Sequence, residues 1–111
     1  MQTEIIASIF KIDRKPYELV PKAFLRNSEM EMSVDYHSGL LKLSEGDEVE
    51  IKLYLNEMPE MEQNAYVMSG IVYEVDDSNV KCSFGGLLLD YKGRNEDIES
   101  GAIIHASIKR I

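Results

Sequence analysis

Apolar and polar residues alternate with a period of two along most of the 111-residue chain, and no long stripe with helical spacing interrupts the pattern. Two segments show it most clearly. In residues 29–36, the positions that share an apolar face are Met30, Met32, Val34 and Tyr36. In residues 48–55, the inward positions are Val49, Ile51, Leu53 and Leu55, and the outward positions are Glu48, Glu50, Lys52 and Tyr54. Both segments are therefore predicted to be strands with one buried and one solvated face.

Six further runs rich in β-branched and aromatic residues complete the expected strands, at residues 5–12, 19–25, 65–75, 80–84, 87–92 and 102–109. Pro21 has no N–H for a β-ladder, so the second of these strands must lie at an edge, carry a bulge or begin late. Turn residues separate the runs, at 13–16, 37–39, 44–47, 76–79 and 99–101. About eight strands at near-even spacing predict an all-β antiparallel barrel or sandwich with little or no helix.

Glycines and a run of leucines add detail to this prediction. Gly70 lies inside a predicted strand, where glycine marks a bulge or a sharp bend at a barrel corner. A strongly coiled strand there would pair with neighbours in both halves of a barrel. Gly85 and Gly86 predict a bulge or a tight turn, because glycine adopts positive φ. Leucines 87–89 cannot all face the core, so at least one is expected to point to a second packing surface or a partner.

Length and cysteine content favour one intracellular domain that spans residues 1–111. The one cysteine, Cys82, cannot form an internal disulfide, which suits a reducing compartment such as the cytosol or nucleus. Glu4 interrupts the N-terminal apolar stretch, so no signal peptide is expected. No apolar run approaches the length of a membrane span.

The formal net charge of −8 comes from the middle of the chain. Residues 1–28 carry +2, residues 29–62 carry −8 and residues 63–111 carry −2. These acids either keep the domain soluble or form a surface that steers a protein partner and repels nucleic acid. Small barrels that bind single-stranded nucleic acid use aromatic side chains in basic grooves. Here several of the six tyrosines are flanked by acids, and basic residues cluster only at 14–15 and 109–110.

Residues able to perform catalysis or bind a metal are dispersed. His37, His105 and Cys82 lie in separate segments without the spacing of metal ligands, and they are interpreted as a turn residue, a strand residue and a buried residue. The acids at 74–77 do not form a calcium-binding loop, and the glycine pair at 85–86 lacks a phosphate-loop pattern. We therefore expect no catalytic residue, no metal and no cofactor, and a chain that is not an enzyme.

Several segments, in order along the chain, resemble one known family. Residues 8–12 are similar to its opening IF-x-V strand, and residues 43–47 to its L-G-D turn. Residues 65–73 (AYVMSGIVY) closely match its YVMYG-x-VY strand, and residues 83–88 (SFGGLL) its SYGGLL turn. Residues 108–110 resemble its basic, apolar C-terminus. Over essentially its whole length, the chain resembles the small β-barrel subunit shared by the nuclear RNA polymerases I, II and III, the subunit 8 family.

The resemblance implies an OB-like antiparallel barrel, related to a duplicated OB fold, in a shortened version whose acidic insertion is reduced to residues 56–64. It implies a non-catalytic subunit of DNA-directed RNA polymerase, located in the nucleus and nucleolus, that docks on the largest subunit and contacts other polymerase subunits. No direct binding of nucleic acid, membrane or small-molecule substrate is expected. The residues predicted to contact the partner are Tyr66, Met68, Phe84, Gly85, Gly86, Leu87 and Leu89. Two alternatives remain open: a free-standing OB-type binder of single-stranded nucleic acid, and a small hydrolase or ligand carrier.

Overall fold

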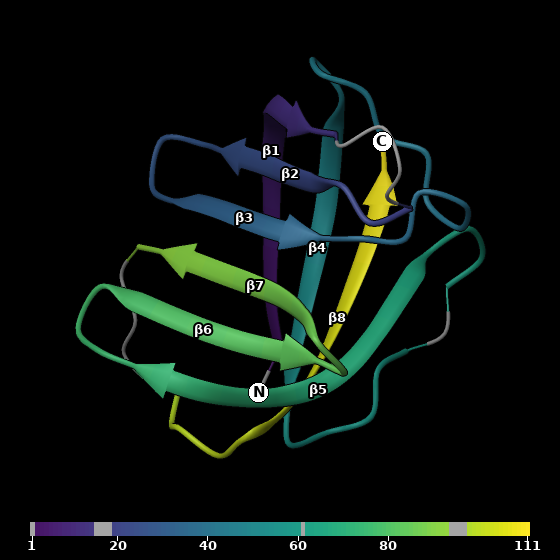
Figure 1. Cartoon of the computed structure of the whole chain (residues 1–111). Coiled ribbons are helices and arrows are strands. Elements are labelled where there is room, and N and C mark those ends of the chain that lie inside the picture. Colours follow the sequence, from purple (N-terminus) through teal and green to yellow (C-terminus); the bar gives the residue numbers. More distant parts are fainter. Residues whose placement is uncertain (1, 15–18, 61, 94–97) are drawn as a thin grey trace.

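The computed structural model describes residues 2–14, 19–60, 62–93 and 98–111, and these residues form strands and turns without any helix (Figure 1). The strands are β1 (Gln2–Asp13), β2 (Lys22–Arg26), β3 (Glu31–Asp35), β4 (Glu48–Leu55), β5 (Tyr66–Val75), β6 (Asn79–Phe84), β7 (Leu87–Lys92) and β8 (Ile103–Arg110). They form one closed antiparallel barrel in the order β1-β2-β3-β7-β6-β5-β8-β4. The predicted all-β barrel of about eight strands is therefore confirmed. Within the described residues, no helix is long and apolar enough to cross a membrane.

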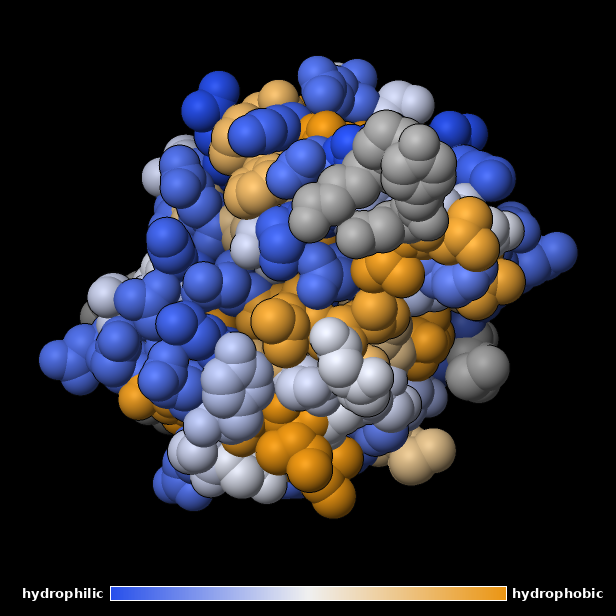
Figure 2. All heavy atoms as spheres, viewed as in Figure 1, coloured by the Kyte–Doolittle hydropathy of each residue, from blue (hydrophilic) through white to orange (hydrophobic). Residues whose placement is uncertain are grey.

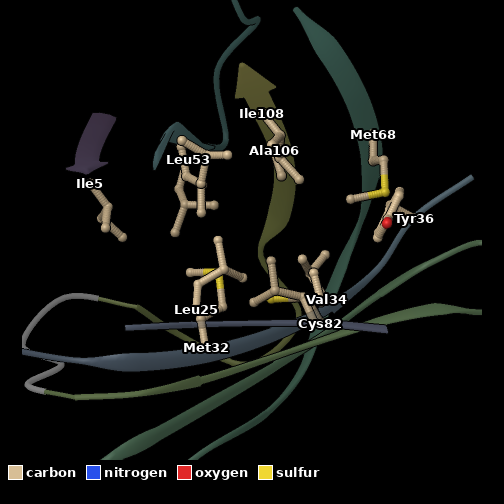
Figure 3. Packing of buried hydrophobic residues seen from close by; sticks show 14 of the residues in the cluster. Ile5, Leu25, Met32, Val34, Tyr36, Leu53, Met68, Cys82, Ala106 and Ile108 are labelled. Carbon is tan, nitrogen blue, oxygen red and sulfur yellow. The ribbon is translucent and has the colours of Figure 1, made fainter. Parts of the chain in front are cut away.

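The alternating apolar positions fill the interior of the barrel. The predicted inward residues of β4 and of the segment around β3 are all buried, with exposed fractions between 0% and 6%. Met68, Tyr36, Val34 and Cys82, which Figure 3 labels, belong to one buried cluster, so that segments distant in the sequence share one core. Complete burial of an aliphatic side chain is worth about 1.5–3 kcal/mol. The core therefore holds together all eight strands rather than one local hairpin.

The late start of β2 and a bulge in β1 have identifiable reasons. β2 begins at Lys22, directly after Pro21, which is the late start that the missing N–H of proline requires. The β1–β2 ladder also has a register shift between Ile9 and Lys11, so Phe10 forms a bulge. The turn predicted at 13–16 lies partly outside the described residues.

The prediction that Tyr54 is outward and solvated is wrong, since this residue is only 1% exposed. Its cross-strand neighbour on β8 is His105, and Lys52 precedes it on the same outer face of β4. Lys52 pairs with Glu62, so the segment that follows β4 folds back over this outer face. Alternation predicts the direction of a side chain, but it cannot predict which later segment will cover it.

β5 connects two parts of the barrel, because its first half pairs with β8 and its second half with β6. Figure 1 shows that this strand is strongly curved, which confirms the predicted coiling. Gly70 lies where β5 and β6 approach each other. A Cβ atom there would lie 2.0 Å from the carbonyl oxygen of Ser83 and 2.8 Å from Cα of Phe84. Glycine is therefore required at this position by the close approach of two backbones.

The expected tight turn between β6 and β7 is formed by Gly85 and Gly86, with φ of +65° and +101°. Positive φ at both central residues is typical of a type I′ hairpin turn. The turn between β5 and β6 is stabilised differently. Asp76 Oδ1 accepts hydrogen bonds from the backbone N–H groups of Ser78 (2.9 Å) and Asn79 (2.8 Å). These bonds favour the ionised carboxylate and lower the pKa of Asp76.

Candidate partner-binding surface

Three of the seven residues predicted to contact a partner lie inside the barrel. Met68, Phe84 and Leu89 are 6%, 6% and 1% exposed. They occupy the inward positions of β5, β6 and β7, and Figure 3 shows Met68 directed toward the core. A partner on the outside of the closed barrel cannot reach these side chains. The contact prediction is wrong for these three residues, which belong to the core, and their outward neighbours form the surface.

The other four predicted residues remain candidates for partner contact. Gly85 and Gly86 are exposed at the tip of the β6–β7 turn, and Leu87 is half-buried against the core. Tyr66 lies at the opposite end of β5, where its hydroxyl accepts a hydrogen bond from the backbone N–H of His37 at 3.2 Å. The structure thus brings three of these residues together and separates the fourth from them.

Leu88, which was not among the predicted contacts, is the leucine of this run that points outward, and it is 41% exposed. Leu88 lies opposite Ser83 on β6. Ser83 lies opposite Ile71 on β5, and Ile71 lies opposite Ile103 on β8. Ile71 and Ile103 are 54% and 55% exposed. We call these four residues the apolar row; neighbouring strands lie about 4.8 Å apart, so its length across β7, β6, β5 and β8 is about 14 Å. In Figure 2, hydrophobic residues gather over the central and lower parts of the viewed face, whereas its left side is mostly hydrophilic.

Hydrogen bonds fix the backbone at both ends of the apolar row. At one end, Asp35 Oδ2 accepts the N–H of Leu88 at 3.0 Å, and Asp35 Oδ1 pairs with Lys22 at 2.9 Å. At the other end, Asn56 Oδ1 accepts the N–H of Ile103 at 3.0 Å, and the Asn56 N–H donates to the Ile103 carbonyl at 2.8 Å. A surface whose backbone is already ordered loses less conformational entropy when a partner binds.

Ser69 and His105 form a polar pair on the outer face of β5 and β8. Ser69 Oγ lies 2.6 Å from Nδ1 of His105, directly across the ladder. A serine beside a histidine is one part of a nucleophilic site, which also needs a group that orients the base and donors for an oxyanion. On β4, the residue opposite His105 is Tyr54, a phenol rather than a carboxylate. We interpret the pair as a polar bridge between two strands.

Cys82 and His37 have the structural positions that the sequence predicted. Cys82 is fully buried, and this burial raises the pKa of its thiol from 9.0 to about 12. The thiol is therefore protonated near neutral pH, in its less reactive form. His37 lies in a turn, where its Nδ1 accepts the N–H of Gly39 at 3.1 Å. Among the described residues, no group of three or more His, Cys, Asp and Glu side chains is placed to hold a metal ion.

A pair of phenylalanines on the outer face of β1 and β2 was missed by the sequence analysis, which considered only the tyrosines. The ring centres of Phe10 and Phe24 lie 6.3 Å apart. The Arg26 guanidinium lies 4.5 Å from the Phe10 ring centre, and the Lys11 amine lies 5.3 Å from that of Phe24. Aromatic rings beside cations are also the groups that bind single-stranded nucleic acid.

The acidic segment that follows β4 contacts the barrel through Lys52. This lysine pairs with Glu62 and lies 3.7 Å from a carboxylate oxygen of Glu50. The hydrogen bond from Lys52, supported by the nearby charge of Lys109, lowers the pKa of Glu62. The pair therefore holds this segment against β4 and β8 while Glu62 is ionised.

Neither a scan against models of protein families nor a search of curated protein sequences found a match for this chain. The family resemblance of the sequence therefore stays a prediction.

Proposed function

We propose that this protein is a non-catalytic subunit of DNA-directed RNA polymerase, common to polymerases I, II and III, that docks on the largest subunit. The observation that carries the proposal is the apolar row on the outer face of β5–β8. Half-exposed aliphatic residues aligned across neighbouring strands are typical of a surface that another protein covers. Three of the four residues, Ile71, Ser83 and Leu88, belong to the two segments that most resemble the polymerase family.

The apolar row is large enough to contribute usefully to binding. Covering the exposed half of each of its three aliphatic side chains is worth about 1 kcal/mol, since full burial is worth about 1.5–3 kcal/mol. Together they contribute about 3 kcal/mol, which corresponds to a factor of about 100 in the dissociation constant. Such a cluster can form the centre of a larger interface, where contact residues matter most.

Purification of a tagged chain from its own cells tests the proposal. We expect the full-length chain, purified under native conditions, to bring down the largest subunits of all three nuclear polymerases, identified by mass spectrometry. Replacing both Ile71 and Ile103 with Asp places charges in the apolar row and should lower the yield of co-purified polymerase by at least about tenfold. Quantitative blotting against the tagged chain measures this yield.

The matched control is Ile6→Asp, because Ile6 is 56% exposed and lies on the outer face of β1, away from the row. We expect this variant to retain polymerase at the wild-type level. Equal losses from Ile6→Asp and from the double variant would show that the row is not the contact. Absence of every polymerase subunit from the wild-type preparation would refute the proposed function.

A second candidate, a free-standing binder of single-stranded nucleic acid, is favoured by the Phe10–Phe24 pair with its adjacent Arg26 and Lys11. The net charge of −8 opposes it, since phosphate backbones are repelled at long range. A fluorescent thymidine oligonucleotide separates the two functions. Micromolar, strongly salt-dependent binding that Phe10→Ala abolishes would support this candidate, and no measurable binding at low salt would exclude it.

A further inference from the structure

The end of the barrel where β5 begins and β8 ends carries two adjoining cavities. The larger, of about 820 Å³, is lined by residues that include Leu40, Lys42, Lys109 and Arg110. The smaller, of about 300 Å³, shares Lys42 with the first and is also lined by Arg14 and Tyr36. We call the two together the basic groove.

The charge of the basic groove is opposite to that of the molecule. Arg14, Lys42, Lys109 and Arg110 line it, whereas none of its described lining residues is acidic. The chain as a whole carries −8. No carboxylate oxygen of the described residues lies within 4.0 Å of the charged groups of Lys42, Lys109 or Arg110, although other lysines do form such pairs. Lys42 and Arg110 are therefore available to an anionic group from outside, whereas Lys109 lies close enough to Glu62 to lower the pKa of that carboxyl.

A buried hydroxyl group points to the same chemistry. Tyr36 is 0% exposed and lines the smaller cavity beside Arg14, whose guanidinium is close enough to favour the ionised Tyr36 hydroxyl, although the two groups do not form a well-aligned hydrogen bond. A buried polar atom without a partner costs about 1–3 kcal/mol, which a bound acceptor would recover. Arg14, at the same cavity, donates from Nη2 to the Leu43 carbonyl at 2.9 Å, and this holds its guanidinium in place. An oxygen anion in this cavity would meet both a hydroxyl donor and a fixed positive charge.

Exposed aromatic surface, which single-stranded nucleic acid requires, is limited in the basic groove. The Tyr36 ring is completely buried, and Tyr66 is half-buried with its hydroxyl engaged by His37. The prominent exposed side chain is Leu40, which is 74% exposed. An apolar contact beside separate cations suits a peptide with carboxylate and aliphatic side chains better than stacked bases.

We propose that the basic groove binds an extended acidic segment of a protein partner, with carboxylates at its cations and an aliphatic side chain against Leu40. The inference rests on the proposed function for the identity of that partner, but the chemistry of the groove does not depend on it. Val67 lines the groove and lies on the same outer face of β5 as Ile71. Four residues of strand separate the two by about 13 Å, so one partner can cover both the groove and the apolar row.

Fluorescence anisotropy with the purified full-length chain tests the proposal. The probe is a fluorescein-labelled peptide of alternating glutamate and leucine, compared with one of alternating lysine and leucine and with a thymidine oligonucleotide. We expect the acidic peptide to bind with micromolar affinity and the other two probes not to bind. Lys42→Glu should weaken binding of the acidic peptide at least about tenfold, because Lys42 lines both cavities and its reversal adds repulsion to the lost attraction. Lys92→Glu makes the same charge change at an exposed position of β7, and it should weaken binding of the acidic peptide less than about twofold.

The remaining outcomes overturn the inference. No binding of the acidic peptide, or equal weakening by Lys42→Glu and Lys92→Glu, would show that the groove is not a specific site. Tighter binding of the oligonucleotide, lost in Lys42→Glu, would assign the groove to nucleic acid. Tyr36→Phe distinguishes a specific site from nonspecific electrostatic attraction, because it removes a hydroxyl without changing the charge. Only a specific site should lose affinity for the acidic peptide, by about threefold or more. Peptide binding that depends on Lys42, in a chain that retrieves no polymerase, would uphold the groove and refute the proposed function.

Discussion

Gly70→Ala tests the close approach of β5 and β6 on which the curved barrel depends. In an ordinary strand position this change stabilises a protein by about 0.4–1 kcal/mol, because the unfolded chain loses conformational freedom. At Gly70, the new Cβ would lie 2.0 Å from the Ser83 carbonyl oxygen and 2.8 Å from the Phe84 Cα. Both of these atoms belong to the backbone, so a change of side-chain rotamer cannot relieve the overlap.

The magnitude follows from the displacement that the methyl group demands. Contacts of Cβ with backbone atoms rarely fall below 3.0 Å, so β6 must move by about 1 Å from Gly70. Overpacking in a well-packed interior costs about 1–3 kcal/mol, and a shift of this size against a hydrogen-bonded strand corresponds to the upper end. After subtraction of the entropic gain, we expect a net loss of about 2–2.5 kcal/mol in the free energy of unfolding.

Urea denaturation monitored by far-UV circular dichroism measures this loss, which suits a chain without tryptophan. With a slope of about 1.2 kcal/mol per molar, the midpoint should fall by about 2 M with the slope unchanged. Asp77→Ala is the control, because it adds no atoms at an exposed position of the same β5–β6 hairpin; we expect a shift within about 0.5 kcal/mol. A Gly70→Ala protein that is more stable than the wild type would refute the close approach.

Three further changes test other parts of the structure. Ile51→Val, in the core between Ile5 and Ile108, should cost about 1 kcal/mol in urea denaturation. Glu62→Gln should speed amide exchange of residues 62–65, measured by mass spectrometry, and leave the β4 ladder protected, because Lys52 loses its charged partner. Burial raises the pKa of the Cys82 thiol from 9.0 to about 12, so between these values the thiol ionises only in the unfolded state. The free energy of unfolding should therefore fall by about 1.4 kcal/mol per pH unit above pH 9. Urea titrations at pH 8 and 10 should show this component disappearing in Cys82→Ala.

The architecture could be predicted because burial and pairing follow the same period of two. All eight strands were expected close to their observed positions, and the boundaries of β4 and β7 agree fully. The glycine pair between β6 and β7 identified its own turn, since few residues other than glycine adopt two successive positive φ values. Tyr54 shows the limit of the pattern, because it lies on the outer face of β4 and is nevertheless buried.

The contact surface was harder to predict than the strands, although part of the signal was present. The choice of Met68, Phe84 and Leu89 selected large apolar residues that belong to the core. Applying the alternation consistently would have assigned Ile71 and Leu88 to the outer face. The pairing of Ile71 with Ile103 could not have been found in this way, because it depends on the register between β5 and β8.

The basic groove shows why net charge alone misleads about partners. Lys42 belongs to the most acidic third of the chain, yet folding places it beside Lys109 and Arg110 from the C-terminal strand. The acids determine the sign of the electrostatic field far from the surface, and salt weakens this field beyond about 10 Å. The groove cations act on groups in direct contact with them. A nucleic-acid strand would be repelled along most of its phosphate backbone. A short acidic peptide can place its few carboxylates on the groove cations, and the rest of its length can avoid the acids of the barrel. The same charge distribution opposes nucleic acid and favours the proposed acidic peptide, which is the discrimination that the proposed polymerase subunit would require.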